Sequence, residues 1–255
     1  MWKLDLSRLI LWRRPVTIDD GWLVSFPKSG RTWMRVVLAD LGIEIPVTHD
    51  GSDYKNPVHF AELLPCGESY RMKKVIFLVR DPRDVVVSYY FELTRRQKVY
   101  AGEIGDFIKD PRYGLERIIY FNMAWFRQSV CSDFLLLTYE SIHETPQRVF
   151  EVATKFLGYR RSARLLKKAV DNASFAALQK LELSGALSGK FGKALLPGDV
   201  DDPESYKVRR GMVRGYTSYL TPEQVDWCNL AIKKSGYHKS LINALSCYGI
   251  DSQRG

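Results

Sequence analysis

The chain of 255 residues has no long hydrophobic run. No apolar stretch approaches the ~20 residues that a membrane-spanning helix needs. Residues 9–12 form an apolar run too short for the centre of a signal peptide, and Arg13 and Arg14 follow it where a small-residue cleavage site would stand. We therefore expect a cytoplasmic protein without a transmembrane segment.

Cysteine is also scarce, and the four cysteines lie far apart. No Cys-x-x-Cys pair is present, and no histidine cluster lies near Cys66, Cys131, Cys228 or Cys247. This spacing favours reduced thiols over zinc ligands or a disulfide framework, so we expect no metal site. Internal repeats and low-complexity tracts are missing too. With 45% hydrophobic residues, the chain is long enough for one core, and we expect a single domain over residues 1–255.

What is present is an excess of positive charge. Lysine and arginine number 38 against 29 aspartate and glutamate residues, which gives a formal net charge of +9. Such a balance favours an anionic ligand: a nucleotide, a sulfated or acidic substrate, nucleic acid or a membrane surface.

Hydrophobic patterning indicates strands alternating with helices. Continuous apolar runs predict buried strands at residues 22–26, 74–79 and 134–138. Helical spacing and capping residues predict helices that end at Leu41, begin at Asp81 or Pro82, cover 114–130, 144–157 and 162–170, and begin again, as the last major helix, at Pro222. Residues 184–210 form one long segment of low periodicity. This alternation predicts an α/β fold with a mostly parallel central sheet flanked by helices.

The turn between the first strand and its helix concentrates anion-binding groups. Lys28 supplies a point charge, Ser29 and Thr32 supply hydroxyl donors, and Gly30 lets the backbone approach a ligand. The N-terminus of the following helix adds free backbone N–H groups. The residues predict a phosphate or sulfate site, the alternative being an ordinary strand–helix connection with a surface lysine. A Walker A loop is excluded because Lys28 precedes the glycine.

A second cluster of charge follows the strand at residues 74–79. Arg80 stands at the carboxyl end of that strand, where open α/β sheets bind ligands, and Ser88 lies about two helical turns further on. Taken alone, these residues leave another interpretation open, in which Arg80 and Arg83 pair with Asp81 and Asp84 on a solvated face.

Two stretches resemble the nucleotide-binding motifs of sulfotransferases that use 3′-phosphoadenosine 5′-phosphosulfate (PAPS). Residues 26–33 resemble the 5′-phosphosulfate loop of that family, although most relatives have threonine where this chain has Arg31. Residues 79–90 resemble its 3′-phosphate-binding pattern. The resemblance implies a P-loop-NTPase-like sulfotransferase fold. It assigns Lys28, Ser29, Gly30, Arg31 and Thr32 to the 5′ end, and Arg80 and Ser88 to the 3′-phosphate.

Three further stretches resemble the same family in the same order. Tyr139 matches a tyrosine near the adenosine, Ser174 and Phe175 match an element that packs against the adenine, and residues 208–216 match the segment that closes over the 3′-phosphate. In that segment Arg209, Arg210 and Gly211 correspond to the family pattern, and the register departs from it afterwards. Trp33 is either plain core or, as in the family, a ring stacked on the adenine.

The base is assigned by position. Many cytosolic relatives carry a histidine in a Lys-Thr-His segment, and this chain has Val47-Thr48-His49 in that interval. An imidazole suits proton removal near neutrality, so His49 is the predicted base. Asp50 is the competing carboxylate, or the group that orients His49. Lys28 is expected to stabilise the bridge oxygen that leaves.

The sequence thus predicts a PAPS-dependent sulfotransferase, which moves a sulfuryl group to a hydroxyl or amine by in-line displacement and releases 3′-phosphoadenosine 5′-phosphate (PAP). The alternatives are a nucleotide kinase or NTPase, and a basic nucleic-acid- or glycan-binding protein without catalysis. Residues 44–72, 91–113 and 184–207 mix aromatic with basic side chains, which suits a small-molecule, lipid or carbohydrate acceptor and not nucleic acid. A homodimer is compatible with the sequence. Without a ligand, the arginines of the 3′-phosphate site are expected to repel one another.

Overall fold

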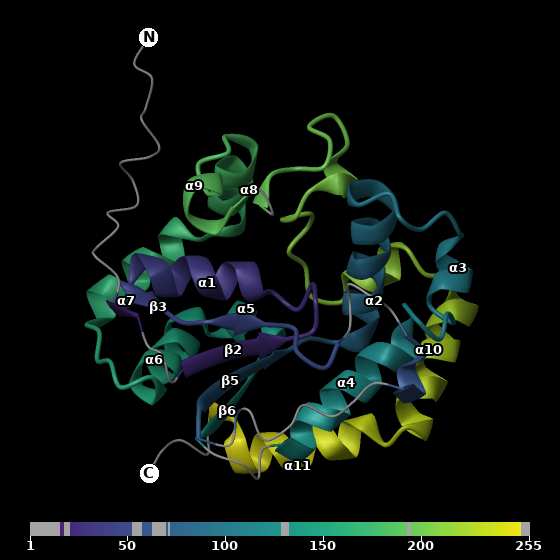
Figure 1. The fold of residues 1–255 in the computed structure, drawn as a ribbon, viewed down its shortest axis with the longest axis horizontal. Coiled ribbons are helices and arrows are strands. Elements are labelled where there is room, and N and C mark those ends of the chain that lie inside the picture. The colour runs from purple at the N-terminus through teal and green to yellow at the C-terminus, as the bar shows by residue number, and fades with distance from the viewer. Residues whose placement is uncertain are drawn as a thin grey trace.

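The computed structural model describes residues 16–17, 21–52, 58–62, 70, 72–128, 133–192 and 195–250. Its centre is a four-stranded parallel sheet (Figure 1). The strand order is β4 (Val47–Thr48), β2 (Gly21–Ser25), β5 (Lys74–Val79) and β6 (Phe134–Thr138). The short strands β1 (Val16–Thr17) and β3 (Ile43–Glu44) pair separately, also in parallel. The three predicted strands and the predominantly parallel sheet are therefore confirmed.

Alternate residues of β2, β5 and β6 face two separate hydrophobic clusters. In β5, Val75, Phe77 and Val79 belong to one cluster, whereas Ile76 and Leu78 belong to the other. All five side chains are at most 2% exposed. Both faces of the sheet are covered, which explains why the strand appears in the sequence as an unbroken apolar run.

Helices cover both faces of the sheet (Figure 1). One cluster contains residues of α1 (Arg31–Asp40), α6 (Pro146–Phe156), α7 (Ala163–Asn172) and α8 (Phe175–Leu183). The other contains residues of α2 (Pro82–Phe91), α3 (Ile104–Phe107), α4 (Leu115–Gln128), α10 (Pro222–Lys234) and α11 (Tyr237–Tyr248). The short helices α5 (Tyr139–Glu144) and α9 (Ser188–Phe191) complete the set.

The helix from Pro222 is not the last major one, which corrects the prediction. After α10 the chain turns at Gly236, whose φ of 71° is in the left-handed region, and α11 follows. Residues at helical spacing in α11, from Tyr237 to Leu241, Ala244 and Leu245, pack on the core. That periodicity is visible in the sequence. The short helix α8 was also missed, because its start coincides with the Ser-Phe pair that was assigned to ligand binding.

Two remaining expectations concern cysteine and the membrane. Cys228 is buried and Cys247 is exposed, both as free thiols, whereas Cys66 and Cys131 lie outside the described residues, as do residues 9–14. Among the helices that the structure describes, none has the length and apolar character to cross a membrane.

Candidate active site

A cavity of about 430 Å³ lies where the sheet's strands end. Lys28 follows β2, His49 follows β4, Arg80 follows β5 and Tyr139 follows β6, and all four residues line it. Parallel strands bring their carboxyl ends to one edge, the usual ligand site of open α/β sheets. The cavity is also lined by the other predicted residues Gly30, Arg31, Thr32, Trp33, Ser88, Ser174, Phe175, Arg209, Arg210 and Gly211. Ser29 and Asp50 do not line it.

The turn after β2 is folded tightly against Tyr139. Lys28 has a φ of 72° and Gly30 a φ of 99°, both in the left-handed region that side chains disfavour. A Cβ on Gly30 would lie 2.5 Å from Cδ2 of the Tyr139 ring. Ser29 is 1% exposed, so it belongs to the interior of the turn. Glycine is therefore required at position 30 by backbone conformation and by space.

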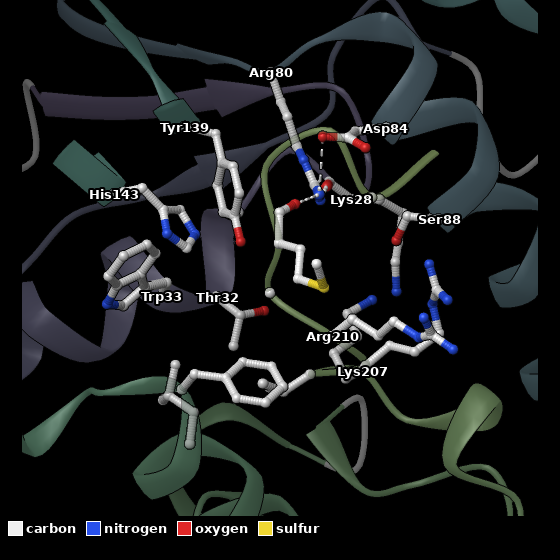
Figure 2. Close-up of a pocket in the computed structure, with 18 of the residues that line it drawn as sticks. Lys28, Thr32, Trp33, Arg80, Asp84, Ser88, Tyr139, His143, Lys207 and Arg210 are labelled. Carbon is white, nitrogen blue, oxygen red and sulfur yellow. Dashed lines mark hydrogen bonds and ion pairs between the residues drawn. The ribbon is translucent and has the colours of Figure 1, made fainter. Parts of the chain in front are cut away.

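Arg80 is held in place from several sides. Its guanidinium donates to the Met212 carbonyl at 2.7 Å, lies 3.5 Å from the Asp84 carboxylate and stacks over the Tyr139 ring at 4.2 Å (Figure 2). Asp84 in turn accepts the backbone N–H groups of Arg214 and Tyr216, both at 2.9 Å. Burial raises the pKa of Asp84, and Arg80 opposes that shift. The arrangement fixes Arg80 at the cavity and ties it to the segment after Gly211.

The two arginines that follow β5, Arg80 and Arg83, differ in their surroundings. Arg83 does pair with Asp81, with 2.6 Å between the guanidinium and the carboxylate. Arg80 pairs with Asp84 but also lines the cavity, so it is placed to bind a ligand as well.

Aromatic rings form the other side of the cavity (Figure 2). The ring of Trp33 lies 5.0 Å from that of His143 and 6.0 Å from that of Tyr139. Trp33 packs on the core cluster and also lines the cavity. Its position is therefore compatible with a core residue and with a ring that stacks on an adenine. Sequence reasoning missed His143, which stands one helical turn after Tyr139 in α5. Burial lowers the pKa of His143, and Arg80 lowers it further.

The predicted closing segment is held together without a ligand. Arg209 donates to Glu204 at 2.6 Å and also to the Tyr219 hydroxyl, and its guanidinium stacks over Phe91 at 4.4 Å. Arg210 reaches the same Glu204 at 3.4 Å. The repulsion that we expected between Arg209 and Arg210 is therefore offset by the negative charge of Glu204, which the prediction did not include. Gly211, with a φ of 63°, lies so close to Phe175 that a Cβ would overlap the ring.

A buried ion cluster beside Lys28 was not predicted. The Lys28 ammonium lies 2.7 Å from Glu92 Oε2, and Arg96 lies 2.8 Å from Glu92 Oε1. Burial alone would favour neutral Glu92, but Lys28, Lys207 and Arg96 hold its pKa well below the usual range. A sequence signal existed: Arg80, Asp84, Ser88, Glu92 and Arg96 recur every four residues, which places them along one side of α2 and of the π-helical turn Glu92–Arg96 that continues it.

His49 is placed as a neutral imidazole. Its Nδ1 lies 2.6 Å from the Ser25 carbonyl oxygen, so Nδ1 carries the hydrogen and donates it, and Nε2 is the acceptor. Burial, the charge of Arg31 and the charge of Lys207 lower the pKa of His49 to about 3, although the Ser25 hydrogen bond acts in the opposite direction. The ring is thus in the protonation state that a base requires.

Asp50 is placed differently from His49. It is exposed, and its carboxylate accepts a hydrogen bond from the Tyr70 hydroxyl at 3.0 Å. The His49 Nδ1–H donates to the Ser25 carbonyl, which fixes the ring.

Comparison with known proteins finds similar sequences and folds among sulfotransferases. Human sulfotransferase 2B1 is 24% identical over 92% of this chain and 70% of its own length, and human sulfotransferase 2A1 is 23% identical over 82% and 81%. The crystal structure of mouse sulfotransferase SULT7A1 complexed with PAP matches 89% of both chains with a TM-score of 0.62 at 17% identity. Retinol dehydratase in a complex with retinol and PAP matches 89% of this chain and 83% of its own, with a TM-score of 0.63 at 14% identity. These two structures share the fold.

The family model of the sulfotransferase domain matches residues 59–238. This range includes Arg80, Ser88, Tyr139 and the Arg209–Gly211 segment but begins after the turn at Lys28. Because it covers more than half of the chain, the protein belongs to the sulfotransferase family.

Proposed function

We propose that this protein transfers a sulfuryl group from PAPS to a hydroxyl or amine of an acceptor by in-line displacement. The observation that carries the proposal is the single cavity at the strand ends. Five stretches far apart in the sequence meet there, and each supplies a group suited to one part of the nucleotide.

The cavity fits a bisphosphorylated adenine nucleotide. Among the residues that the structure describes, Arg80 Nε and Arg209 Nε are buried donors of the cavity lining without a hydrogen-bond partner. Buried polar groups left unpaired are costly, and an anion that accepts from them would remove that cost. The aromatic side suits an adenine ring. Neighbouring solved structures carry PAP, which supports the same ligand here.

Residue roles follow from position. Lys28 and the backbone N–H groups of residues 29–33 would hold the 5′ end, with Arg31 and Thr32 beside them. The 3′-phosphate would lie against Arg80, Ser88 and the Arg209–Gly211 segment. Tyr139, Trp33, Ser174 and Phe175 would contact the adenosine, and His143 joins them.

PAPS, when bound, supplies the sulfuryl group. His49 Nε2 would accept the proton of the acceptor, while Nδ1 stays on the Ser25 carbonyl and keeps the ring oriented. Lys28 would place its positive charge where negative charge develops on the bridge oxygen. As in phosphoryl transfer, the work is positioning and electrostatics.

The acceptor is proposed to be a small molecule. Of the aromatic side chains of residues 91–113, Phe107 is fully buried and packs against Tyr100 and Tyr113, so Phe107 itself is not available to an acceptor. Membership of the sulfotransferase family does not favour a kinase, an NTPase or a non-catalytic nucleic-acid- or glycan-binding protein. A cytoplasmic location, a homodimer, the single domain and the absence of nucleic-acid binding stay predictions.

Calorimetric titration of PAP and of AMP tests the proposal. A charged hydrogen bond contributes about 1.5–3 kcal/mol, so contacts to the 3′-phosphate should favour PAP over AMP by at least about 10²-fold. Arg210→Ala should reduce that preference with little cost in stability, since the Arg210 side chain is 45% exposed.

Lys155→Ala is the matched control, because Lys155 forms an exposed ion pair with Glu151 on α6. Equal affinities of wild type for PAP and AMP would remove the 3′-phosphate site and, with it, the proposed donor.

A further inference from the structure

Two lysines from distant parts of the chain share one carboxylate oxygen. Glu92 Oε2 lies 2.7 Å from the ammonium of Lys28 and 3.4 Å from that of Lys207. The side chain of Glu92 is 4% exposed, that of Lys28 5% and that of Lys207 26%. Both lysines line the cavity (Figure 2). Lys207 therefore stands at the same end of the cavity as Lys28.

The position of Lys207 is fixed by the fold. The carboxylate of Glu182, in α8, accepts the backbone N–H of Lys207 at 2.6 Å and that of Val208 at 2.8 Å. Glu182 is 1% exposed, so this anchor lies in the interior. An anchored backbone aims the Lys207 side chain at Glu92, whereas a surface lysine on a loose segment would have no preferred direction.

The cluster carries more positive than negative charge. Lys207 faces Lys28 from the turn after β2, Glu92 and Arg96 from the π-helical turn, and His49 from the end of β4. Three cations thus face two carboxylates: Glu92, and Glu182, which interacts with the charges of Arg96 and Lys28. Burial and the charge of Lys28 lower the pKa of Lys207 to about 7, and the charge and hydrogen bond of Glu92 oppose that shift. A partly buried excess of cations is a place where a bound anion is stabilised.

We propose that Lys207 is a second cation at the 5′-phosphosulfate end of the nucleotide site, within reach of the 5′-phosphate, and that Glu92 is the positioning residue that holds it beside Lys28. The identity of the ligand rests on the proposed function. Lys207 is assigned to this end because it shares Glu92 with Lys28. The 3′-phosphate end adjoins it, since Arg80, held by Asp84 and Met212, also donates to the Lys28 carbonyl at 3.4 Å. Two ammonium groups around the transferred group would stabilise the negative charge that builds there.

Binding of three nucleotides tests the role of Lys207 without any measurement of transfer. Lys207→Ala should weaken AMP and PAP by about 10-fold each, the loss of one charge-assisted contact. It should change the affinity for adenosine 3′-monophosphate, which has no 5′-phosphate, by less than about 2-fold. Lys155→Ala, which removes the same charge from an exposed pair on α6, should change none of the three.

Two outcomes would overturn the role of Lys207. An equal loss for adenosine 3′-monophosphate would assign Lys207 to the 3′-phosphate, and unchanged AMP affinity would leave it without a ligand. Failure of the proposed function would look different, because wild type itself would then show no preference for PAP over AMP.

Glu92 is tested by a pH profile of AMP affinity. Lys207 loses its charge as pH rises through about 7, so affinity should fall over that range in wild type. Lys207→Arg should stay flat there, because arginine remains charged. Glu92→Gln removes the group that favours the charged form of Lys207, so the midpoint should move to lower pH. The proposal is contradicted if the midpoint is unchanged in Glu92→Gln. It is also contradicted if the wild-type profile is identical to that of Lys207→Arg. This second comparison decides the question even if Glu92→Gln does not fold.

Discussion

His49 combines two properties that a base at this position needs. Its orientation comes from a backbone carbonyl, which cannot rotate away as a side chain can. Its neutral form comes from burial and from the positive charges of Arg31 and Lys207. The same cations that would attract the nucleotide therefore also keep the base unprotonated. Asp50 is exposed, accepts a hydrogen bond from Tyr70 and does not line the cavity.

Substitution of the two residues should separate them. His49→Ala should lower kcat by about 10²–10⁴-fold, the usual contribution of general-base catalysis, and leave PAP affinity within about 2-fold. Asp50→Asn should keep most of the activity. Steady-state kinetics with labelled PAPS and a reactive acceptor, beside PAP calorimetry, measures both. An active His49→Ala with an inactive Asp50→Asn would make the carboxylate the base.

The pH dependence of the same rate gives an independent check. The pKa of His49 is lowered to about 3, so the ring gains a proton only as pH falls toward that value. Between pH 7 and pH 5 the free enzyme should therefore keep its base, and kcat/KM should not decline through His49. A decline with a midpoint near pH 6 that disappears in His49→Ala would contradict the lowered pKa.

Single residues were predictable where they stand at a strand end. Arg80 and Tyr139 directly follow long strands and Lys28 lies in the turn after one, so an apolar run locates them. His49 follows the two-residue strand β4 and was located by the family resemblance. Lys207 and Glu92 were not predictable in this way. Lys207 lies in a segment without periodicity and is placed by a hydrogen bond to Glu182, a tertiary contact that no local pattern encodes. Glu92 follows an apolar helix and looks like its solvated end.

At the scale of elements, the strand–turn–helix unit of β2 and α1 depends on one backbone conformation. Gly30 and Gly158 both have left-handed φ values, 99° and 89°. A Cβ on Gly30 would meet the Tyr139 ring at 2.5 Å, whereas a Cβ on Gly158 would meet nothing within 4 Å. The pair therefore separates backbone strain from steric overlap.

Alanine at each glycine should give different results. Gly158→Ala should cost about 1–2 kcal/mol of unfolding free energy, the strain of a left-handed alanine, and leave PAP affinity unchanged. Gly30→Ala should cost more and should weaken PAP, because the Tyr139 ring must move at the cavity wall. Urea denaturation and calorimetry measure the two effects. Equal costs in both variants, with PAP affinity intact, would show that the Tyr139 contact is unimportant.

The sequence indicated best those elements that have a strong hydrophobic pattern, either a period or a continuous apolar run. The period of two cannot be seen in β5 because both faces are buried, yet its continuous apolar run still identifies the strand. The π-helical turn Glu92–Arg96 and the short strand β4 have no such signal. Their form depends on what packs around them, so they could not be derived from local pattern.

At the scale of the whole molecule, the two hydrophobic clusters share one sheet. The strands β2, β5 and β6 contribute side chains to both. The cavity is lined by residues packed on each cluster: Trp33 and Val208 on one, Tyr216 and Tyr219 on the other. A ligand in that cavity therefore touches both layers. The net charge of +9 adds a general attraction for an anionic ligand.

This arrangement predicts that the chain unfolds as one unit and that PAP stabilises all of it. Loss of either cluster would expose one face of the sheet, so neither should remain folded alone. At a free PAP concentration 100 times its dissociation constant, mass action adds about 2.7 kcal/mol, or a rise in Tm of roughly 5–10 °C for a chain of this size. Scanning calorimetry should show one transition that moves as a whole, and AMP at the same concentration should move it less. Two transitions, of which PAP shifts only one, would mean that the clusters fold independently and that the chain holds two domains.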